Sequence, residues 1–367
     1  MHNNRELFCK ENGLTLLYLS TKNFLRSGLI IFSFILSIIS SAQTIGGSAA
    51  YNFLQLPSSP LLTATGGVNV SYQANEVGLA ANNPALLNQQ LHGQLNISFN
   101  NFLGDIKTYS TTGAYHSEKL NATFGGHIYF VDYGSIPQTD AAGNVSGSFH
   151  PIDFVVQAEV AKKYLDKWSY GLTLKFINSS YQQYTSNALA FDVGILYADS
   201  ANDFSASVLA KNMGFQLKTY AGEKEDLPFD LQVGITKKLA KAPFAFSATA
   251  QHVHQFNTVY NDAVFNTDNS LQTDNSFFNK LINHFVVASH IFIGNNLEAT
   301  LGYNHLRRTE LNLGAGGNGL NGFSVGLRIK FQKLQVLYAR SNYQRNIAFN
   351  QIGITVGLNK IFGLGEL

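Results

Sequence analysis

The chain has 367 residues, of which 45% are hydrophobic and only 13% are charged, about half the charged share of ordinary globular domains. Its 25 basic and 23 acidic residues leave a net charge of +2, so no basic field is present to attract nucleic acid. Gly, Phe and Tyr are abundant (32, 28 and 17 residues), which suits β-strands bordered by aromatic girdles.

Residues 1–42 have the organisation of a signal peptide. Four basic residues precede an apolar run at 29–39, and Ser40-Ser41-Ala42 then supplies a small-x-small cleavage site. The alternative is a membrane anchor, but this run is well short of the ~20 residues that a helical span needs. We expect cleavage after Ala42. Cys9, the only cysteine, is then removed, so the exported product has neither a disulfide nor a cysteine metal site.

Residues 43–91 show no strand or helix period and contain several Gly and Pro residues. They are too apolar to remain disordered as a free tail. We therefore expect a compact segment packed inside another structure.

The remainder of the chain predicts β-strands. In 321–331, Phe323, Val325, Leu327, Ile329 and Phe331 alternate with polar or charged residues, which is the period of a strand with two different faces. Fourteen such strands are predicted, near 92–101, 106–116, 119–131, 151–163, 167–180, 187–198, 203–211, 228–238, 244–255, 283–293, 296–306, 321–331, 333–343 and 349–359. Strands of nine or more residues are long for a globular protein but fit a tilted membrane crossing.

The connections between these strands alternate in length. The links after even-numbered strands are a few residues long, whereas those at 132–150, 212–227, 256–282 and 307–320 are long. Short turns at one rim and long loops at the other are typical of an outer-membrane barrel. We therefore predict an all-β fold, a 14-stranded antiparallel transmembrane β-barrel over 92–361, with 43–91 as a lumenal segment. A water-soluble β-sandwich is the competing interpretation.

The polar strand faces place nine charged residues in the predicted lumen: Asp153, Glu159, Lys175, Asp192, Lys211, Asp230, Glu298, Arg328 and Lys330. One hypothesis is a path for a substrate or an ion. The other is a network of ion pairs that holds the N-terminal segment, and the mixed signs favour it because a selective pore more often shows one sign.

No pattern in the sequence indicates catalysis. His252 and His254 share one strand face, but that face continues Phe244 and Phe246, so it is expected to point to lipid rather than to form a metal site. No motif fixes a nucleophile beside a base. We predict a non-enzymatic protein with no catalytic residue, metal or cofactor.

Two stretches resemble a known family. Asn82-Asn83-Pro84-Ala85-Leu86-Leu87 is similar to the Asn-Pro-Ala signature in the N-terminal hatch of FadL-type outer-membrane barrels. A second stretch, between two Gly-Gly pairs, reads Tyr51-Asn52-Phe53-Leu54-Gln55-Leu56-Pro57. It resembles the N-terminal sequence of mature proteins of the PorQ family, which are FadL-like barrels of the Bacteroidota type IX secretion system. The resemblance implies that residues 43–91 form a hatch, with Asn83, Pro84 and Ala85 as its motif and Tyr51, Phe53, Leu54, Leu56 and Pro57 as its opening.

The resemblance also implies a function. Proteins of this family take part in cell-surface attachment in the outer membrane, with a PorZ surface protein and the PorU–PorV sortase complex as partners. The alternative is uptake of a hydrophobic small molecule, as in FadL transporters. Because the predicted outer loops are longer than strand closure requires, we expect docking residues there: Lys218 and Glu225 in one loop, and Phe265, Phe277 and Phe278 in the next.

Overall fold

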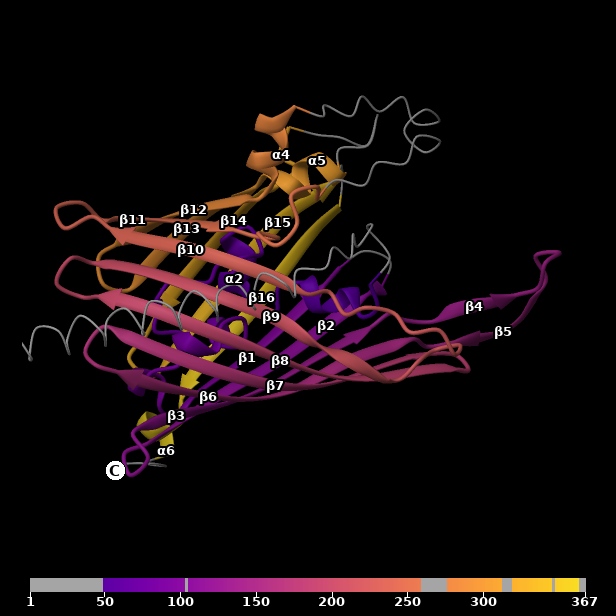
Figure 1. The fold of residues 1–367 in the computed structure, drawn as a ribbon, viewed down its shortest axis with the longest axis horizontal. Helices are drawn as coiled ribbons and strands as arrows, with labels where there is room; N and C mark the ends of the chain where they lie inside the picture. Colours follow the sequence, from indigo (N-terminus) through magenta and orange to yellow (C-terminus); the bar gives the residue numbers. More distant parts are fainter. Residues whose placement is uncertain (1–48, 103–104, 259–275, 312–318, 345–346, 363–367) are drawn as a thin grey trace, which may run out of the picture. The chain divides into compact units, whose positions relative to one another are not determined.

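The computed structural model describes residues 49–102, 105–258, 276–311, 319–344 and 347–362. The predicted signal peptide and Phe265 lie outside these residues. Fourteen strands pair antiparallel with their neighbours and close into one barrel, in which β1 pairs with both β2 and β16 (Figure 1). The predicted fold class is confirmed.

The barrel strands follow one another around the wall in chain order. They are β1 (Gln94–Asn101), β2 (Lys107–Ser117), β3 (Ala122–Asp132), β6 (Ile152–Tyr164), β7 (Trp168–Tyr181), β8 (Tyr184–Asp199), β9 (Phe204–Lys218), β10 (Asp230–Lys238), β11 (Phe244–Ala250), β12 (Phe285–Ile293), β13 (Leu297–Asn304), β14 (Phe323–Lys330), β15 (Leu334–Gln344) and β16 (Ile347–Gly357). Most boundaries fall within two or three residues of those that the period-two pattern predicts.

Three differences from the prediction lie at the end of the barrel that carries the longer connections. Strand β9 continues to Lys218 rather than ending at 211, so Lys218 belongs to the wall and not to a docking loop. The extension follows a β-bulge, where the register with β8 shifts between Phe191 and Val193 and Asn212 takes a left-handed φ of 59°. Strand β11 ends at Ala250, before the two histidines. Residues 132–150 contain a hairpin, β4 (Ile136–Thr139) with β5 (Val145–Phe149), that extends from the barrel rim (Figure 1).

The two faces of the wall differ sharply in polarity. Outward residues are large and exposed, as in the row formed by Phe99, Ile352 and Tyr338, which are register partners on β1, β16 and β15. Inward residues are mostly polar and buried, as with Asn96, Ser98 and Asn100 on β1. An apolar outer face around a polar interior is the arrangement that a bilayer requires of a closed barrel.

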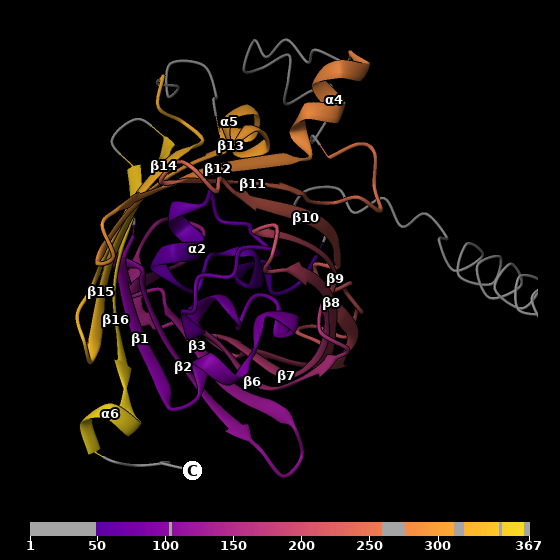
Figure 2. The ribbon, with the colours of Figure 1, turned by 90° about the vertical axis from the view of Figure 1, so that its left-hand side faces the viewer.

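Short helices are the other regular elements of the described chain. Residues 49–91 contain η1 (Asn52–Gln55), α2 (Pro60–Ala64), η2 (Val77–Leu79), η3 (Pro84–Leu86) and η4 (Gln89–Leu91), and Figure 2 shows this segment, in indigo, inside the ring of strands. We call residues 49–91 the hatch. At the loop end lie α4 (Phe277–Asn283) and α5 (His305–Leu311), and α6 (Leu358–Phe362) follows the last strand. Among the described residues, no helix is both long and apolar enough to cross a bilayer.

Candidate functional site in the barrel lumen

The hatch runs along the lumen from one rim to the other. At the loop end, the backbone N–H of Ala50 donates to the carbonyl of Asp226 over 2.9 Å, and the Tyr51 hydroxyl is hydrogen-bonded to Ser186 of β8. At the short-turn end, the N–H of Gly93 donates to the carbonyl of Ala114 of β2 over 3.0 Å. The chain therefore fills the barrel lengthwise before the first strand begins.

The Asn-Pro-Ala stretch packs directly against the wall strands β6, β7 and β8. The side chain of Asn83 caps η3 by accepting from the N–H of Ala85 (3.0 Å), and its amide donates to the carbonyl of Val70 (2.7 Å) and to Ser207 of β9 (2.9 Å). Pro84 suits the first position of a helical turn because its φ is already set and it has no N–H to leave unpaired. Asn83 thus joins two hatch segments to the wall.

This close approach depends on glycines in the wall. A Cβ added to Gly171 of β7 would lie 2.5 Å from the carbonyl carbon of Pro84, and one added to Gly194 of β8 would overlap the side-chain oxygen of Asn83. Glycine in a strand interior weakens it and often marks a place where another backbone approaches. Here the two glycines form a seat for η3.

On the opposite wall, a buried ionic cluster holds the middle of the hatch. The Tyr72 hydroxyl donates to Glu298 of β13 (2.6 Å), and its ring stacks on His290 of β12, with 3.7 Å between ring centroids. Arg328 of β14 is paired with Glu298, and one of its guanidinium N–H groups donates to the carbonyl of Ala74 (2.8 Å). We call Tyr72, His290, Glu298 and Arg328 the clamp.

Two more polar hatch residues contact the last strand. Thr63 donates to Gln351 (2.6 Å), and Glu76 accepts from Thr355 (3.0 Å) as well as from the N–H of Gly78 (2.9 Å). Burial raises the pKa of the Glu76 carboxyl, although these hydrogen bonds and the Arg328 charge lower it in part. Tyr72, Thr63 and Glu76 carry no motif that would mark them as contact residues from the sequence. What distinguishes them there is only that they are polar residues in an otherwise apolar segment.

An apolar patch lies on one side of the lumen, just below the inward polar residues Asp153, Ser179 and Ser186 of the loop end. Its wall residues come from four neighbouring strands, and we call them the apolar tier: Tyr129, Val131, Val155, Ile177, Ala188 and Ala190. Tyr51, Phe53 and Leu54 of the hatch pack against them, and Leu227 closes the cluster from the loop that follows β9. The predicted hatch-opening residues Tyr51, Phe53, Leu54 and Pro57 are buried, and Leu56 is half-buried.

The charged residues predicted for the lumen all point inward. Lys175 forms an ion pair with Asp192 (2.6 Å) in which both side chains are buried, and Lys211 donates to Asn82 of the hatch (2.7 Å). Asp153 accepts hydrogen bonds from Ser179, from Tyr133 (2.6 Å) and from Tyr181 (3.0 Å). Most of these groups are thus paired with one another or with the hatch, as the network hypothesis predicts.

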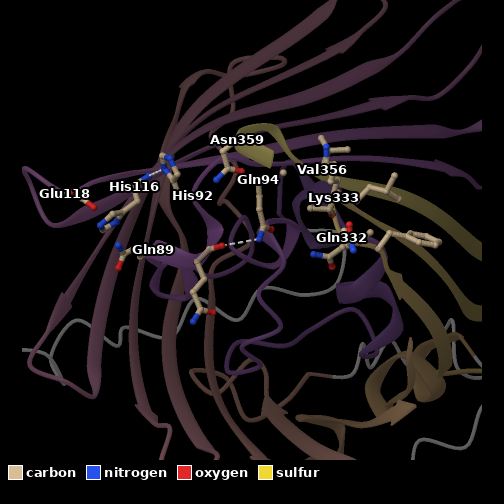
Figure 3. A pocket seen from close by; sticks show the side chains of 15 residues that line it. Gln89, His92, Gln94, His116, Glu118, Gln332, Lys333, Val356 and Asn359 are labelled. Atoms are coloured by element: carbon tan, nitrogen blue, oxygen red, sulfur yellow. Dashed lines mark hydrogen bonds between the residues drawn. The ribbon is translucent and has the colours of Figure 1, made fainter. Parts of the chain in front are cut away.

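A polar cavity of about 420 Å³ lies at the short-turn rim (Figure 3). The end of the hatch, the start of β1, the ends of β2 and β16, and the turn between β14 and β15 line it. His92 and His116 are joined through the N–H of His116 (3.0 Å), and Gln94 donates to the carbonyl of Gln90 (3.3 Å). The rest of the lining includes Glu118 and Lys333, a mixture that brings together no nucleophile and base.

The residues predicted for partner docking lie at the loop end but not together. Phe277 and Phe278 are the first residues of α4 and are 70% and 66% exposed. Glu225 is exposed, and its backbone N–H donates to the side-chain oxygen of Gln216 (2.8 Å). Lys218 ends β9, as described above. No described element joins these residues into one surface.

His252 and His254 lie beyond the end of β11 rather than on its lipid-facing side. His252 takes a left-handed φ of 53°, which interrupts the alternation of the strand. Its backbone N–H donates to Asp230 of β10 (2.6 Å), and the ring nitrogen Nδ1 lies 3.4 Å from the same carboxylate oxygen. Within the described residues, no three His, Cys, Asp or Glu side chains come together in a way that would hold a metal ion.

Comparison with known proteins finds likeness in structure only. No family model and no curated sequence matches the chain. Among solved structures, a TodX monoaromatic hydrocarbon channel mutant matches 82% of this chain and 98% of its own, with 12% identity and a TM-score of 0.48. A CymD monoaromatic hydrocarbon channel matches 84% and 97%, with 11% identity and a TM-score of 0.47. A KdgM porin matches 72% and 98%, with 8% identity and a TM-score of 0.30. Likeness at this level says nothing of what the present chain binds.

Proposed function

We propose that this chain is a non-enzymatic outer-membrane barrel that admits an apolar small molecule through its lumen. The observation that carries the proposal is the apolar tier, which the first residues of the hatch cover. A channel for hydrophilic solutes has a polar interior throughout. An apolar lining would serve no such solute, whereas small-molecule sites are lined mainly by apolar and aromatic side chains.

The way the hatch covers the tier supports the same proposal. Phe53 and Leu54 supply the buried apolar contacts, while the Ala50 backbone and the Tyr51 hydroxyl supply the polar ones. A ligand that replaces Phe53 and Leu54 would exchange one set of apolar contacts for another, with little change in buried area. The tier lies beside the long connections, at the end from which an external solute would arrive.

The test is uptake of a hydrophobic dye, 1-N-phenylnaphthylamine, by cells whose outer membrane carries the protein. We expect saturable entry above that of cells without it, and faster entry for Phe53→Ala because the cover is smaller. Leu62→Ala, in a separate buried cluster that includes Leu196 of β8 and Leu337 of β15, is the matched control and should leave the rate unchanged. Entry equal to that of cells without the protein, for both the wild type and Phe53→Ala, contradicts the proposal.

A second candidate function is surface attachment, as the PorQ resemblance implies. We propose it because Phe277 and Phe278 begin α4 with most of their surface in solvent, and exposed aromatic side chains of this size often mark an interface. In this role the barrel, in the outer membrane of a Bacteroidota-type cell, would hold a PorZ-like surface protein and through it a PorU–PorV sortase complex.

The double variant Phe277→Ser, Phe278→Ser separates the two functions. If the barrel anchors a partner, the surface protein that co-purifies with the wild type is lost from the variant, while dye entry is unchanged. The exposed residue Val145 of β5, replaced by Ser, provides a control at the same end of the barrel. Co-purification that is equal in all three proteins excludes α4 as the docking element.

A further inference from the structure

Three inward side chains form a row across adjacent strands beneath the hatch. Glu159 of β6 is the register partner of Thr173 of β7, which is in turn the register partner of Asp192 of β8. All three are buried, with 3%, 0% and 0% of their surface exposed. Directly opposed side chains in a sheet have Cβ atoms about 5 Å apart, so the row brings their oxygens close together.

Two members of this row have no partner among the described residues. Neither oxygen of the Glu159 carboxylate takes part in a hydrogen bond, nor does the Thr173 hydroxyl. The side-chain oxygen of Gln157, two residues before Glu159 on the same face, is also without one. Nearly all buried polar atoms in folded proteins are hydrogen-bonded, so four such oxygens in one place require an explanation.

The hatch encloses the Glu159 carboxylate against the wall. A Cβ added to Gly125 of β3 would lie 2.5 Å from Oε2 of Glu159 and 3.1 Å from Leu87 of the hatch. Leu87 follows η3, which packs against β6, β7 and β8. The carboxylate therefore lies in a small space between three wall strands and an apolar hatch residue.

The charges around Glu159 do not balance it. Lys175 is paired with Asp192 (2.6 Å), and the Lys211 ammonium donates to Asn82 of the hatch (2.7 Å). Among the described residues, neither lysine forms an ion pair with Glu159. A buried carboxylate without a compensating positive charge is strongly unfavourable.

We propose that Glu159, Gln157 and Thr173 bind one monovalent alkali cation, Na⁺ under ordinary conditions. Carboxylate, amide and hydroxyl oxygens are hard donors of the kind that such ions prefer, and a single positive charge restores neutrality. A divalent ion would leave an excess positive charge close to Lys175. Because Leu87 closes the site, the bound ion ties the hatch to the β6–β8 wall, whichever solute the barrel admits.

The experiment measures thermal unfolding of the full-length protein in detergent micelles, in NaCl and in choline chloride at equal ionic strength. Choline is too large for the enclosed site. An ion that binds only the folded state stabilises it increasingly with concentration, so we expect the midpoint in NaCl to be higher by at least ~2 °C. Glu159→Gln should abolish the difference. Thr173→Val should raise the Na⁺ concentration needed for half the effect about tenfold.

Asp153→Asn is the matched control, since it removes another buried carboxylate of β6 that already accepts three hydroxyl donors. It should retain the full response to Na⁺. Crystals of the wild type soaked in Tl⁺ give a second readout that needs no variant, with an anomalous peak expected between Glu159 and Thr173. Equal midpoints in the two salts, or no peak, would mean that a proton balances Glu159 and would overturn the proposal. Stabilisation by Ca²⁺ alone would equally overturn it.

Discussion

A Cβ placed on Gly171 of β7 would lie 2.5 Å from the carbonyl carbon of Pro84 and 2.6 Å from the N–H nitrogen of Ala85. Residue 171 can therefore be nothing larger than glycine while η3 remains in its seat. We expect Gly171→Ala to give a barrel that assembles, because alanine fits a strand, but whose hatch is displaced from the wall. Single-channel recording in planar bilayers should show a conductance that the wild type lacks.

Gly126→Ala supplies the control for this variant. Gly126 lies on β3, and a Cβ there would meet nothing within 4 Å. Its conductance should equal that of the wild type. Silent recordings from Gly171→Ala, with the barrel correctly inserted, would show that η3 can shift without opening the lumen.

The clamp predicts a large loss of stability when one of its charges is removed. Arg328 and Glu298 are both buried, so Arg328→Met removes the guanidinium that is ion-paired with the Glu298 carboxylate inside the barrel. The expected cost is about 3–5 kcal/mol, against about 1–3 kcal/mol for Tyr72→Phe, which removes one hydrogen bond to that carboxylate. The shift from folded to unfolded mobility on heating in SDS gives the measurement.

Arg340→Met is the control for the clamp variants. Arg340 of β15 is exposed on the outer face, where its guanidinium donates to the side chain of Asn350 (3.2 Å). We expect its effect to stay within about 0.5 kcal/mol. If Arg328→Met is no more harmful than Arg340→Met, the clamp does not stabilise the barrel.

The strand pattern predicted the wall well because side-chain direction in a strand alternates strictly. Asp153, Glu298 and Arg328 could therefore be assigned to the lumen from their spacing alone. Contacts between distant segments could not be predicted in this way. Tyr72 and Glu298 are separated by 226 residues, and nothing in the local sequence of either residue specifies the other.

The errors at the loop end have local causes. The bulge at Asn212 adds a residue to one strand, after which the alternation continues in a shifted register to Lys218. The sequence pattern predicts a loop for residues 136–149, although they form a hairpin. Almost all of the hairpin side chains are exposed, so neither face needs to be apolar and the alternation that marks the wall strands is missing. The pattern predicts a last strand that runs to residue 359, but β16 ends at Gly357 and Leu358 begins α6.

Glu76 predicts a dependence of stability on pH. Burial raises its pKa in the folded protein above the ordinary value of 4.5, so between the two values the folded state binds a proton that the unfolded state has lost. The contribution of Glu76 to the free energy of unfolding is therefore fully present below pH 4.5. It is lost as the pH rises through the raised pKa that this carboxyl has in the folded protein. Unfolding midpoints measured from pH 4 to pH 8 should decline accordingly.

Glu76→Gln isolates this contribution from that of other titrating groups. The glutamine keeps an oxygen to accept from Thr355 and Gly78 but carries no charge at any pH. The unfolding midpoint of the variant should therefore rise relative to that of the wild type as the pH increases. A difference that is constant over the whole range would mean that Glu76 titrates alike in the folded and unfolded chains.

The last prediction concerns the outer face. Ile354 of β16 is 47% exposed, between its register partners Ile97 and Val336, and the next residues along this row, Thr111 of β2 and Ile329 of β14, carry no charge. Arginine at a lipid-facing position costs about 2–4 kcal/mol at the bilayer midplane. Ile354→Arg should therefore lower the amount of heat-modifiable barrel in the outer-membrane fraction.

Val145→Arg shows whether the effect comes from the membrane or from lost apolar surface in general. Val145 is 68% exposed, but it belongs to the hairpin that extends from the barrel rim, where an arginine stays in water (Figure 1). Its outer-membrane level should match that of the wild type. Equal outer-membrane levels for both arginine variants would mean that residue 354 faces water. The outer face of the barrel would then not contact lipid at this position, which contradicts the assignment of that face to the bilayer.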